Sequence, residues 1–348
     1  MPKILVTGAN GFVGGALCSQ AVVRGMVVRG ITRTPCNLPA EVGNLVVGRI
    51  DDGTNWREML TGCEVVIHLA ARVHVMHDTE TDPLTAFRSV NVGGTLNLAC
   101  QAAAAGVKRF VFISSVKVSG ESTSPGRAFT EADAPNPQDA YGLSKHEAEQ
   151  GLRRLSADTG MDVVIIRPPL VYGPGVKANF AALMRAVQRG WPLPVGAVHN
   201  QRSLVALDNL VDFIVTCITH PQAANQTFFV SDGQDLSTTE LVRGMAQAAG
   251  VSARLLPVPV WALQAGASLL GKGNAVQRLC GNLQVDISKA RSFLGWVPSV
   301  AVAEGLRRAI GIGDRLPRFA FLEHPVQGPC GVSEQIRQTR NDENCGSQ

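Results

Sequence analysis

The chain has 348 residues, of which 45% are apolar and 17% charged, a balance that supports a sizeable core and excludes wholesale disorder. Its 32 Lys and Arg residues against 28 Asp and Glu give a net charge of only +4, which is too weak to indicate nucleic-acid binding. The eight cysteines form no C-x-x-C pair, so we expect reduced thiols rather than disulfides or a zinc site.

Short β-branched runs alternate with helical patterns through the first half of the chain. We predict strands at Ile4–Thr7, Val27–Thr32, Leu45–Gly48, Val65–Leu69, Phe110–Ser114 and Val163–Arg167, and helices at Gly11–Arg24, Thr85–Ala105 and Ser144–Ala157. The strand runs show almost no polar alternation, which is typical of strands buried on both faces of a parallel sheet. The sequence therefore predicts an α/β fold with a Rossmann-type doubly wound parallel sheet.

Beyond residue 170, prolines and glycines cluster and the strand–helix rhythm loosens, with helices predicted near 180–190, 208–220, 238–249 and 302–312. We expect residues 1–170 to form a dinucleotide-binding domain. Residues 171–322 would form a smaller C-terminal lobe, from which the chain can cross back to the sheet. Residues 323–348 are polar and are expected to form a flexible tail.

The N-terminus leads straight from Met1-Pro2-Lys3 into an apolar strand, without a signal-peptide pattern. No apolar run reaches the roughly 18 residues that a membrane span requires, so we expect a cytoplasmic protein with no membrane span. The most apolar stretch, Val258–Leu270, is interrupted by Pro259, Gln264 and Gly266. It is predicted to be a core or interface helix, and peripheral membrane contact stays open.

A glycine-rich loop follows the first predicted strand. Gly8, Gly11 and Gly14 form a G-x-x-G-x-x-G pattern that also contains Phe12 and Val13 and opens a helix. The first glycine permits a tight turn, the second lets the backbone approach a pyrophosphate, and the third packs the helix on the strand. The pattern in this strand–turn–helix context predicts a dinucleotide site.

The end of the second predicted strand carries no carboxylate to bond the adenosine ribose, whereas Arg33 follows it directly. An arginine there can pair with a 2′-phosphate. We therefore expect NADP(H), with NAD(H) as the alternative and Arg33 as a plain surface charge in that case.

A candidate proton-transfer site combines Tyr141 and Lys145, one helical turn apart, with Ser115 at the carboxyl end of a strand. A nearby ammonium favours the phenolate, so we expect Lys145 to lower the pKa of Tyr141. Tyr141 could then exchange a proton with a hydroxyl or carbonyl to which Ser115 hydrogen-bonds.

Together, these motifs resemble the extended short-chain dehydrogenase/reductase family, in its branch acting on nucleotide sugars. Four further segments agree, namely His68-Leu69-Ala70-Ala71, Asn91-Val92-Gly93-Gly94-Thr95, Arg167-Pro168 with Val171-Tyr172-Gly173-Pro174, and Ser288-Lys289-Ala290 before Leu294-Gly295-Trp296. The resemblance implies that Tyr141 is the acid/base, that Lys145 tunes it and holds the nicotinamide ribose, and that Ser115 orients substrate. It also places Ala70 and Asn91 along the cofactor. The family's Gly-Asp signature reads Gly48-Arg49 here, so Asp51 is expected to substitute for its adenine contact.

The resemblance further implies that the second lobe binds a nucleoside diphosphate-sugar, here a UDP-sugar. Asn179 matches the family's diphosphate and base contact, and Arg202 and Arg278 match its two phosphate-binding arginines. Lys117 is expected beside the sugar or in solvent. A homodimer is an expectation of the family alone.

The reaction is narrowed by two positions after Ser115. The Asp-Glu pair of the 4,6-dehydratases reads Val116-Lys117 here, which argues against dehydration. The missing carboxylate after the second predicted strand, together with Arg33, favours reduction over epimerisation. Residues 131–137 and 201–212 also resemble bacterial UDP-4-keto-6-deoxy-N-acetylglucosamine 4-reductases. The resemblance implies NADP(H)-dependent C4 reduction of a UDP-4-keto-6-deoxy-N-acetylhexosamine to UDP-N-acetylfucosamine or UDP-N-acetylquinovosamine, for surface polysaccharide (O-antigen) synthesis. One alternative is an NAD-dependent UDP-glucose or UDP-N-acetylglucosamine 4-epimerase. The other, from a different class, is a non-catalytic cofactor-sensing regulator.

His68, His74 and His77 with Asp78 invite a metal interpretation. Because the predicted chemistry needs no metal, we expect no metal site, with His68 packed at the end of a strand.

Overall fold

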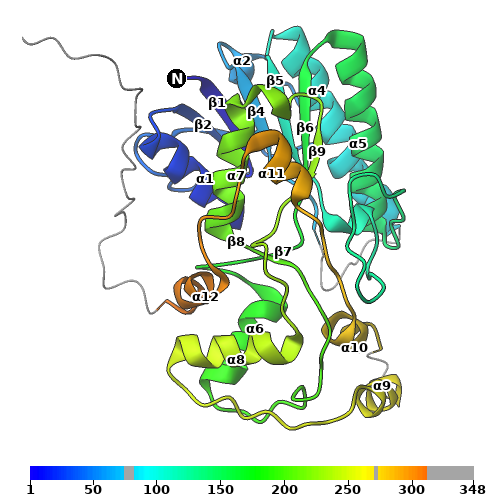
Figure 1. The fold of residues 1–348 in the computed structure, drawn as a ribbon. Coiled ribbons are helices and arrows are strands. Elements are labelled where there is room, and N and C mark those ends of the chain that lie inside the picture. The colour runs from blue at the N-terminus through cyan, green and yellow to red at the C-terminus, as the bar shows by residue number, and fades with distance from the viewer. Residues whose placement is uncertain (74–81, 270–272, 312–348) are drawn as a thin grey trace, which may run out of the picture. The chain divides into compact units, whose positions relative to one another are not determined.

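The computed structural model describes residues 1–73, 82–269 and 273–311. Its main feature is a seven-stranded sheet in the order β3-β2-β1-β4-β5-β6-β9 (Figure 1), with every neighbouring pair parallel. The strands are β1 (Lys3–Thr7), β2 (Val27–Thr32), β3 (Gly43–Val46), β4 (Val65–His68), β5 (Arg109–Ile113), β6 (Asp162–Arg167) and β9 (Thr227–Phe229). The chain builds outward in one direction from β1 and in the other from β4. The predicted doubly wound parallel sheet is confirmed.

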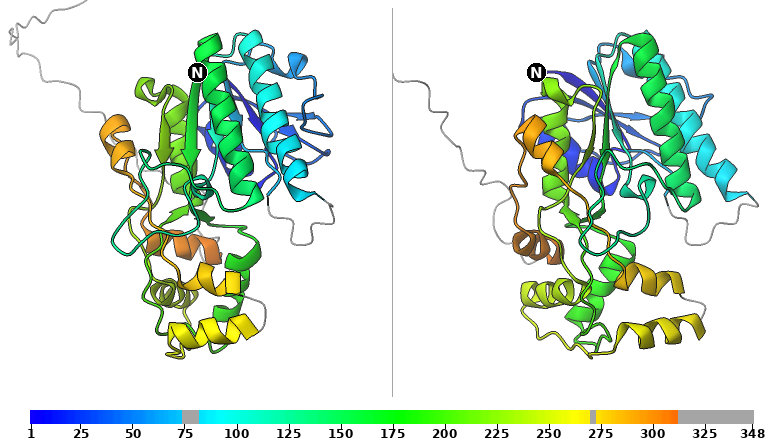
Figure 2. Two further views of the ribbon diagram at one scale, coloured as in Figure 1. Left: turned by 90° about the vertical axis from the view of Figure 1, so that its right-hand side faces the viewer. Right: turned by 45° about the vertical axis from the view of Figure 1, so that its right-hand side comes forward.

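Helices cover both faces of this sheet (Figure 2). One face carries α1 (Phe12–Val23), α7 (Leu207–Thr219) and α11 (Ser288–Leu294); the other carries α2 (Arg57–Leu60), α4 (Thr95–Ala104) and α5 (Ala140–Thr159). Successive strand residues point to opposite faces, so Ile4 and Val6 enter the first core while Leu5 enters the second. This double burial explains the uninterrupted apolar strand runs.

A smaller group of elements surrounds a third core that includes Tyr172 and Phe180. The two-stranded parallel sheet of β7 (Leu170–Tyr172) and β8 (Leu204–Ala206) lies beside α6 (Ala178–Gln188), α8 (Thr238–Ala249) and α12 (Val302–Ile310). Two further helices, α9 (Val260–Leu269) and α10 (Gly273–Cys280), pack on each other. We call the elements from β7 to α6 and from α8 to α10 the small lobe.

The described residues up to 311 belong to one compact unit. Although α7, β9 and α11 follow residue 171, they return to the large sheet, where β9 pairs with β6. The predicted tail, 323–348, lies outside the described residues. Among the helices that the structure describes, none is both long and apolar enough to cross a membrane.

The glycine loop follows β1 and leads into α1. Gly8 has a φ of +69°, in the left-handed region, and the Gly11 amide donates to the Gly8 carbonyl over 2.8 Å. A Cβ on Gly14 would lie 2.1 Å from the Gly8 oxygen, so α1 can pack this closely only on a glycine. The turn therefore directs the N-terminus of α1 toward the carboxyl edge of the sheet.

A buried imidazole links the strands at the same edge. The Nδ1 of His68 hydrogen-bonds the Thr7 hydroxyl at 2.8 Å, and its Nε2 hydrogen-bonds the Thr95 hydroxyl at 3.0 Å. The ring thus connects β4 to β1 on one side and to α4 on the other. Burial, and secondarily the charge of Lys145, lowers the pKa of His68 to about 3, so the ring is neutral at physiological pH.

Replacing Gly14 by alanine should destabilise the protein by about 1–3 kcal/mol or more, because the new methyl group meets backbone that cannot move aside cheaply. Gly15→Ala is the matched control, since its Cβ would find its nearest neighbour at an ordinary 3.7 Å. That control should be neutral or stabilising by about 0.5–1 kcal/mol. Urea unfolding followed by circular dichroism compares the two, and equal stability would refute the packing argument.

The buried His68 should make stability depend on pH. Between its ordinary pKa of 6.5 and its folded value of about 3, the unfolded chain binds a proton that the folded protein excludes. The free energy of unfolding therefore decreases as the pH is lowered from 6.5 to about 3, by at most about 1.4 kcal/mol per pH unit from this group. Urea titrations over the window should give a shallower slope for His68→Gln than for the native chain; parallel slopes would contradict it.

Candidate functional site

The three predicted catalytic residues meet at the carboxyl end of β5. Ser115 follows that strand, and Tyr141 and Lys145 lie in the first turns of α5, whose N-cap Asp139 accepts from the Gly142 amide over 2.7 Å. The Ser115 side chain hydrogen-bonds the Tyr141 hydroxyl. The buried Lys145 donates its Nζ to the Ile113 carbonyl over 2.7 Å. A hydroxyl pair and an ammonium group are thus held by one helix and one strand end.

The protonation of this cluster differs from the sequence expectation. Burial, and secondarily the negative charge of Asp139, raises the pKa of Tyr141 to about 12, although the hydrogen bond from Ser115 opposes the shift. Burial lowers the pKa of Lys145 to about 7, against the pull of Glu149. These residues alone therefore keep the phenol protonated, because burial raises the pKa of Tyr141 by more than the Ser115 hydrogen bond lowers it.

Asn91 lies between this cluster and the segment after β4. Its Oδ1 accepts from the Arg72 amide at 2.8 Å, and its Nδ2 donates to the Arg72 carbonyl at 3.0 Å and to the Ser144 hydroxyl at 2.9 Å. It belongs to η1 (Ser89–Gly94), a short π-helical segment between α3 (Pro83–Arg88) and α4, and such segments often mark functional sites. In this structure Asn91 fixes the segment that carries Ala70.

The other predicted cofactor residues line the same edge. Ala70 faces the glycine loop, since a Cβ on Gly8 would lie 3.2 Å from the Ala70 amide nitrogen. Phe12 and Val13 are half-buried at the start of α1. Arg33 is exposed beyond β2, and among the described residues no hydrogen bond or ion pair holds its guanidinium.

Asp51 sits in the turn after β3. One carboxylate oxygen accepts from the Gly53 amide at 3.2 Å and from the Thr54 hydroxyl at 3.1 Å, and the other pairs with Arg49 at 2.9 Å. These contacts shape the turn, and its contact with an adenine stays a prediction.

The predicted substrate residues come from separate elements. Arg202 donates to the Gly281 carbonyl over 3.0 Å. Burial lowers its pKa, Glu121 opposes that shift, and the charge of Arg278 on α10 adds to it. The structure therefore brings the two arginines near one another. Asn179 is exposed in the first turn of α6.

Lys117 lies in η2 (Val116–Val118), directly after Ser115. Its ammonium pairs with Glu121 at 2.8 Å and with Asp139, the N-cap of α5. The side chain is therefore not simply in solvent, as one expectation had it, because two carboxylates hold it beside the start of the catalytic helix.

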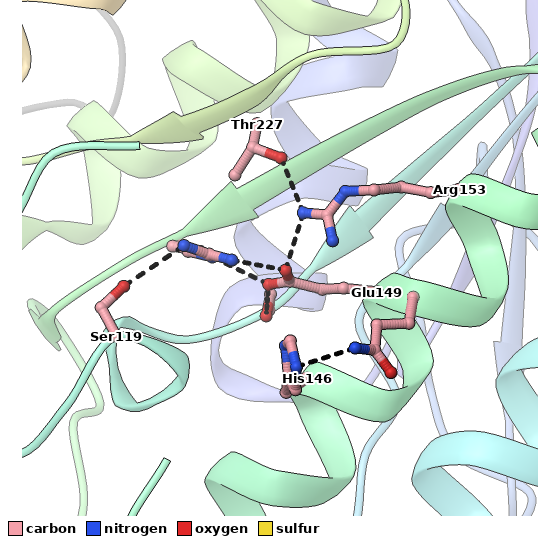
Figure 3. A network of polar contacts seen from close by, with 8 residues as sticks. Ser119, His146, Glu149, Arg153 and Thr227 are labelled. Atoms are coloured by element: carbon pink, nitrogen blue, oxygen red, sulfur yellow. Dashed lines mark hydrogen bonds and ion pairs between the residues drawn. The ribbon is translucent and has the colours of Figure 1, made fainter. Parts of the chain in front are cut away.

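Sequence reasoning missed a buried network beneath the site (Figure 3). The fully buried Glu149 receives Arg167 of β6 at both carboxylate oxygens, over 2.9 and 2.6 Å, and the Ser114 hydroxyl over 2.6 Å. Arg167 also reaches Ser119 over 3.2 Å, and Arg153 reaches Glu149 over 2.9 Å. The available signals were a charged residue ending an apolar strand and a glutamate four residues after Lys145, on one helix face.

Metal binding finds no support in the part of the chain that the structure describes. It contains no cluster of three or more His, Cys, Asp or Glu side chains suited to a metal ion. Both ring nitrogens of His68 are engaged by threonine hydroxyls. His74, His77 and Asp78 lie outside the described residues.

Known proteins agree with this architecture. Residues 4–230 match the NAD dependent epimerase/dehydratase family. The chain is 51% identical over 312 residues to a protein of Vibrio cholerae named UDP-glucose 4-epimerase, covering 88% of this chain and 94% of that protein. The structure of MoeE5 in complex with UDP-glucuronic acid and NAD is 26% identical, with a TM-score of 0.72 and coverage of 90% and 99%. A UDP-glucuronic acid 4-epimerase from Bacillus cereus, in complex with NAD, shares the fold at 22% identity and a TM-score of 0.72, with the same coverage.

Two expectations are wrong. The first is NADP(H) as the favoured cofactor, because the matching family is described as NAD dependent and the MoeE5 structure contains NAD. The second is C4 reduction of a 4-keto sugar, because the 51% identical relative is named a 4-epimerase. The cofactor error came from Arg33, and the reductase error came from Arg33 together with the resemblance of residues 131–137 and 201–212 to 4-reductases. A cation after β2 is compatible with a 2′-phosphate but does not require one, and the Arg33 guanidinium is exposed.

The glycine loop, the Tyr141–Lys145 helix and the strand order all lie within a region that matches a single family over more than half of the chain. With the 51% identical relative covering most of both chains, this protein belongs to the NAD dependent epimerase/dehydratase family.

Proposed function

We propose that this protein is an NAD-dependent 4-epimerase of UDP-hexoses, acting on UDP-glucose or UDP-N-acetylglucosamine. The observation that carries the proposal is the hydrogen-bonded Ser115–Tyr141 pair beside the buried Lys145, in a chain 51% identical to a protein named UDP-glucose 4-epimerase. This constellation can move a proton on and off a sugar hydroxyl, which both halves of an epimerisation require.

The residues at the sheet edge fit NAD. A Cβ on Gly14 would clash with the Gly8 carbonyl, so this glycine lets α1 begin directly after the turn that follows β1. The N-cap Gly11 makes no side-chain capping hydrogen bond, which leaves the helix N-terminus suited to a pyrophosphate. At the end of β2, the Thr32 hydroxyl and the Asn44 side chain lie 3.3 Å apart. These neutral groups can bond ribose hydroxyls in place of the usual carboxylate. Ala70, Asn91 and Asp51 complete the proposed set.

Tyr141 would take the proton from the sugar 4-hydroxyl and later return it to the alkoxide, while Ser115 hydrogen-bonds the same oxygen. NAD, when bound, supplies the hydride acceptor and the positive charge of its oxidised ring. That charge matters because the pKa of Tyr141 is about 12 without it. The Nζ of Lys145 donates to the Ile113 carbonyl, and the charge of Glu149 raises the pKa of Lys145. Lys145 would hold ribose hydroxyls and stabilise the phenolate.

The protein would bind its substrate mainly through the diphosphate group. Arg202 is half-buried, and burial and the charge of Arg278 lower its pKa while Glu121 raises it. A bound diphosphate would stabilise both guanidiniums. Asn179 would add a contact from α6, and Lys117 would stay beside the sugar. Holding the diphosphate rather than the sugar would suit epimerisation, because the sugar must turn opposite faces of C4 toward the cofactor in the two half-reactions.

The direct test incubates the purified chain with UDP-glucose and with UDP-N-acetylglucosamine in the presence of NAD, and separates the products by chromatography. We expect interconversion with the 4-epimer of at least one of them. Tyr141→Phe should lower the rate by roughly 10²–10⁴-fold while calorimetry shows unchanged binding of NAD and UDP. A full rate in this variant would remove Tyr141 from the mechanism, and cofactor binding without turnover in the native chain would favour a regulator.

Replacing Arg202 by alanine should raise KM for the UDP-sugar by roughly 10-fold or more, since a charge-assisted contact to a diphosphate contributes about 1.5–3 kcal/mol. Arg243→Ala, an exposed arginine on α8, is the matched control and should leave KM unchanged. Steady-state kinetics at saturating NAD measure both. An equal KM in the two variants would show that Arg202 does not hold the substrate.

A further inference from the structure

The helix α9 exposes an apolar stripe where a helix of this kind normally presents polar residues. Trp261, Ala265 and Leu269 follow one another at four-residue spacing on its outer side. Trp261 is 72% exposed and Leu269 is 89% exposed. The helix contains no charged residue, and its exposed polar side chains are Gln264 and Ser268, outside this stripe.

The segment before α9 extends the apolar surface. Leu256, which is 49% exposed, donates its amide to the Leu193 carbonyl over 2.9 Å, and Leu193 donates to the Arg254 carbonyl over 2.8 Å. This short ladder brings the end of the segment after α6 beside the approach to α9, which begins four residues after Leu256. Trp191, 55% exposed, precedes this ladder by two residues, and its amide donates to the Ala186 carbonyl of α6.

Cations flank these exposed apolar side chains. The Arg189 guanidinium lies 5.6 Å from the centre of the Trp191 ring, and the Arg254 side chain lies beside Gly190. Both arginines are exposed. We call Trp191, Leu256, Trp261 and Leu269, with Arg189 and Arg254, the lobe patch.

The sequence around the lobe patch lacks negative charge. Residues 168–207 and 241–285 contain no Asp or Glu but eight Lys or Arg, although the whole chain has 28 acidic residues. An isologous contact with a second copy through this patch would therefore set cations against cations. The patch instead fits an apolar layer that lies under a negatively charged surface.

We propose that the lobe patch binds the surface of a bilayer rich in anionic lipids, with Trp261 and Leu269 entering the headgroup region and Arg189 and Arg254 pairing with lipid phosphates. Tryptophan suits this depth because its ring is apolar and its N–H is polar. The 10 residues of α9 are too few to span a bilayer, so the contact is peripheral. This inference does not depend on the proposed function.

The test sediments the purified full chain with vesicles of phosphatidylglycerol and phosphatidylethanolamine, and with vesicles of phosphatidylcholine as reference. We expect binding to the anionic vesicles that weakens at high salt, and little binding to phosphatidylcholine. Intrinsic fluorescence gives a second readout. Trp56 and Trp296 are buried, so a blue shift on binding reports Trp191 or Trp261, and Trp261→Phe should reduce it.

Paired variants separate the two contributions. Trp261→Ser with Leu269→Gln should lower vesicle affinity by roughly 10-fold or more, since both apolar groups leave the bilayer. Arg189→Glu with Arg254→Glu should lower it by at least about fivefold per removed cation. The controls are Val297→Ser, at a valine that is 60% exposed outside the patch, and Arg57→Glu on α2, and neither should change binding. Epimerase activity on the soluble UDP-sugar should persist in all four proteins.

Three outcomes would overturn the proposal. They are no preference for anionic vesicles, equal binding by patch variants and controls, and loss of a concentration-dependent dimer in the patch variants without any vesicle binding. The last result, measured by analytical ultracentrifugation, would assign the patch to a second copy of this chain.

Discussion

The ion pair between Glu149 and Arg167 holds helix α5, which carries Tyr141 and Lys145, in place against the sheet. Both groups are buried, and the bidentate contact over 2.9 and 2.6 Å joins the middle of α5 to the end of β6. Removing one partner of such a pair typically costs about 3–5 kcal/mol, because the other charge is left buried and uncompensated. Everything that the site does with Tyr141 and Lys145 rests on this connection, since both lie on the same face of α5, one and two turns before Glu149.

The same pair couples geometry to charge. Glu149 favours the ammonium form of Lys145 and so limits the fall in its pKa to about 7, while Ser114, next to Ser115, also donates to Glu149. The network therefore positions the proton-transfer groups and sets part of their electrostatics in one arrangement. The proposed epimerisation, in which Tyr141 becomes a transient phenolate, would need such a preorganised environment.

Much of the fold could be predicted from local pattern. Six strands were expected close to their observed bounds. Most of them form unbroken apolar runs because both of their faces are buried, whereas the edge strand β3 is exposed along its length. The expected single helix at Thr85–Ala105 is instead α3, η1 and α4, because Asn91 and its neighbours there serve the loop after β4. Glu149 and Arg167 were missed as a pair, since their contact spans 18 positions and follows from topology, not from spacing. The cofactor error at Arg33 has a similar origin, in that a residue type was interpreted without the contacts that would orient it.

The return of β9 to the large sheet has a consequence for how the chain can fold. β9 (Thr227–Phe229) is the neighbour of β6 and closes that side of the sheet, and α7 and α11 supply much of the cover for one face. Until the ribosome has released residue 229, the apolar strand β6 is an open sheet edge of the kind that invites pairing with other chains. Native pairings between residues 165 and 227 also close a long loop, which slows folding. A nascent chain of this protein thus passes through a long interval in which β1 to β6 have been synthesised but the edge of β6 is still unpaired. Chaperone binding would matter most during this interval.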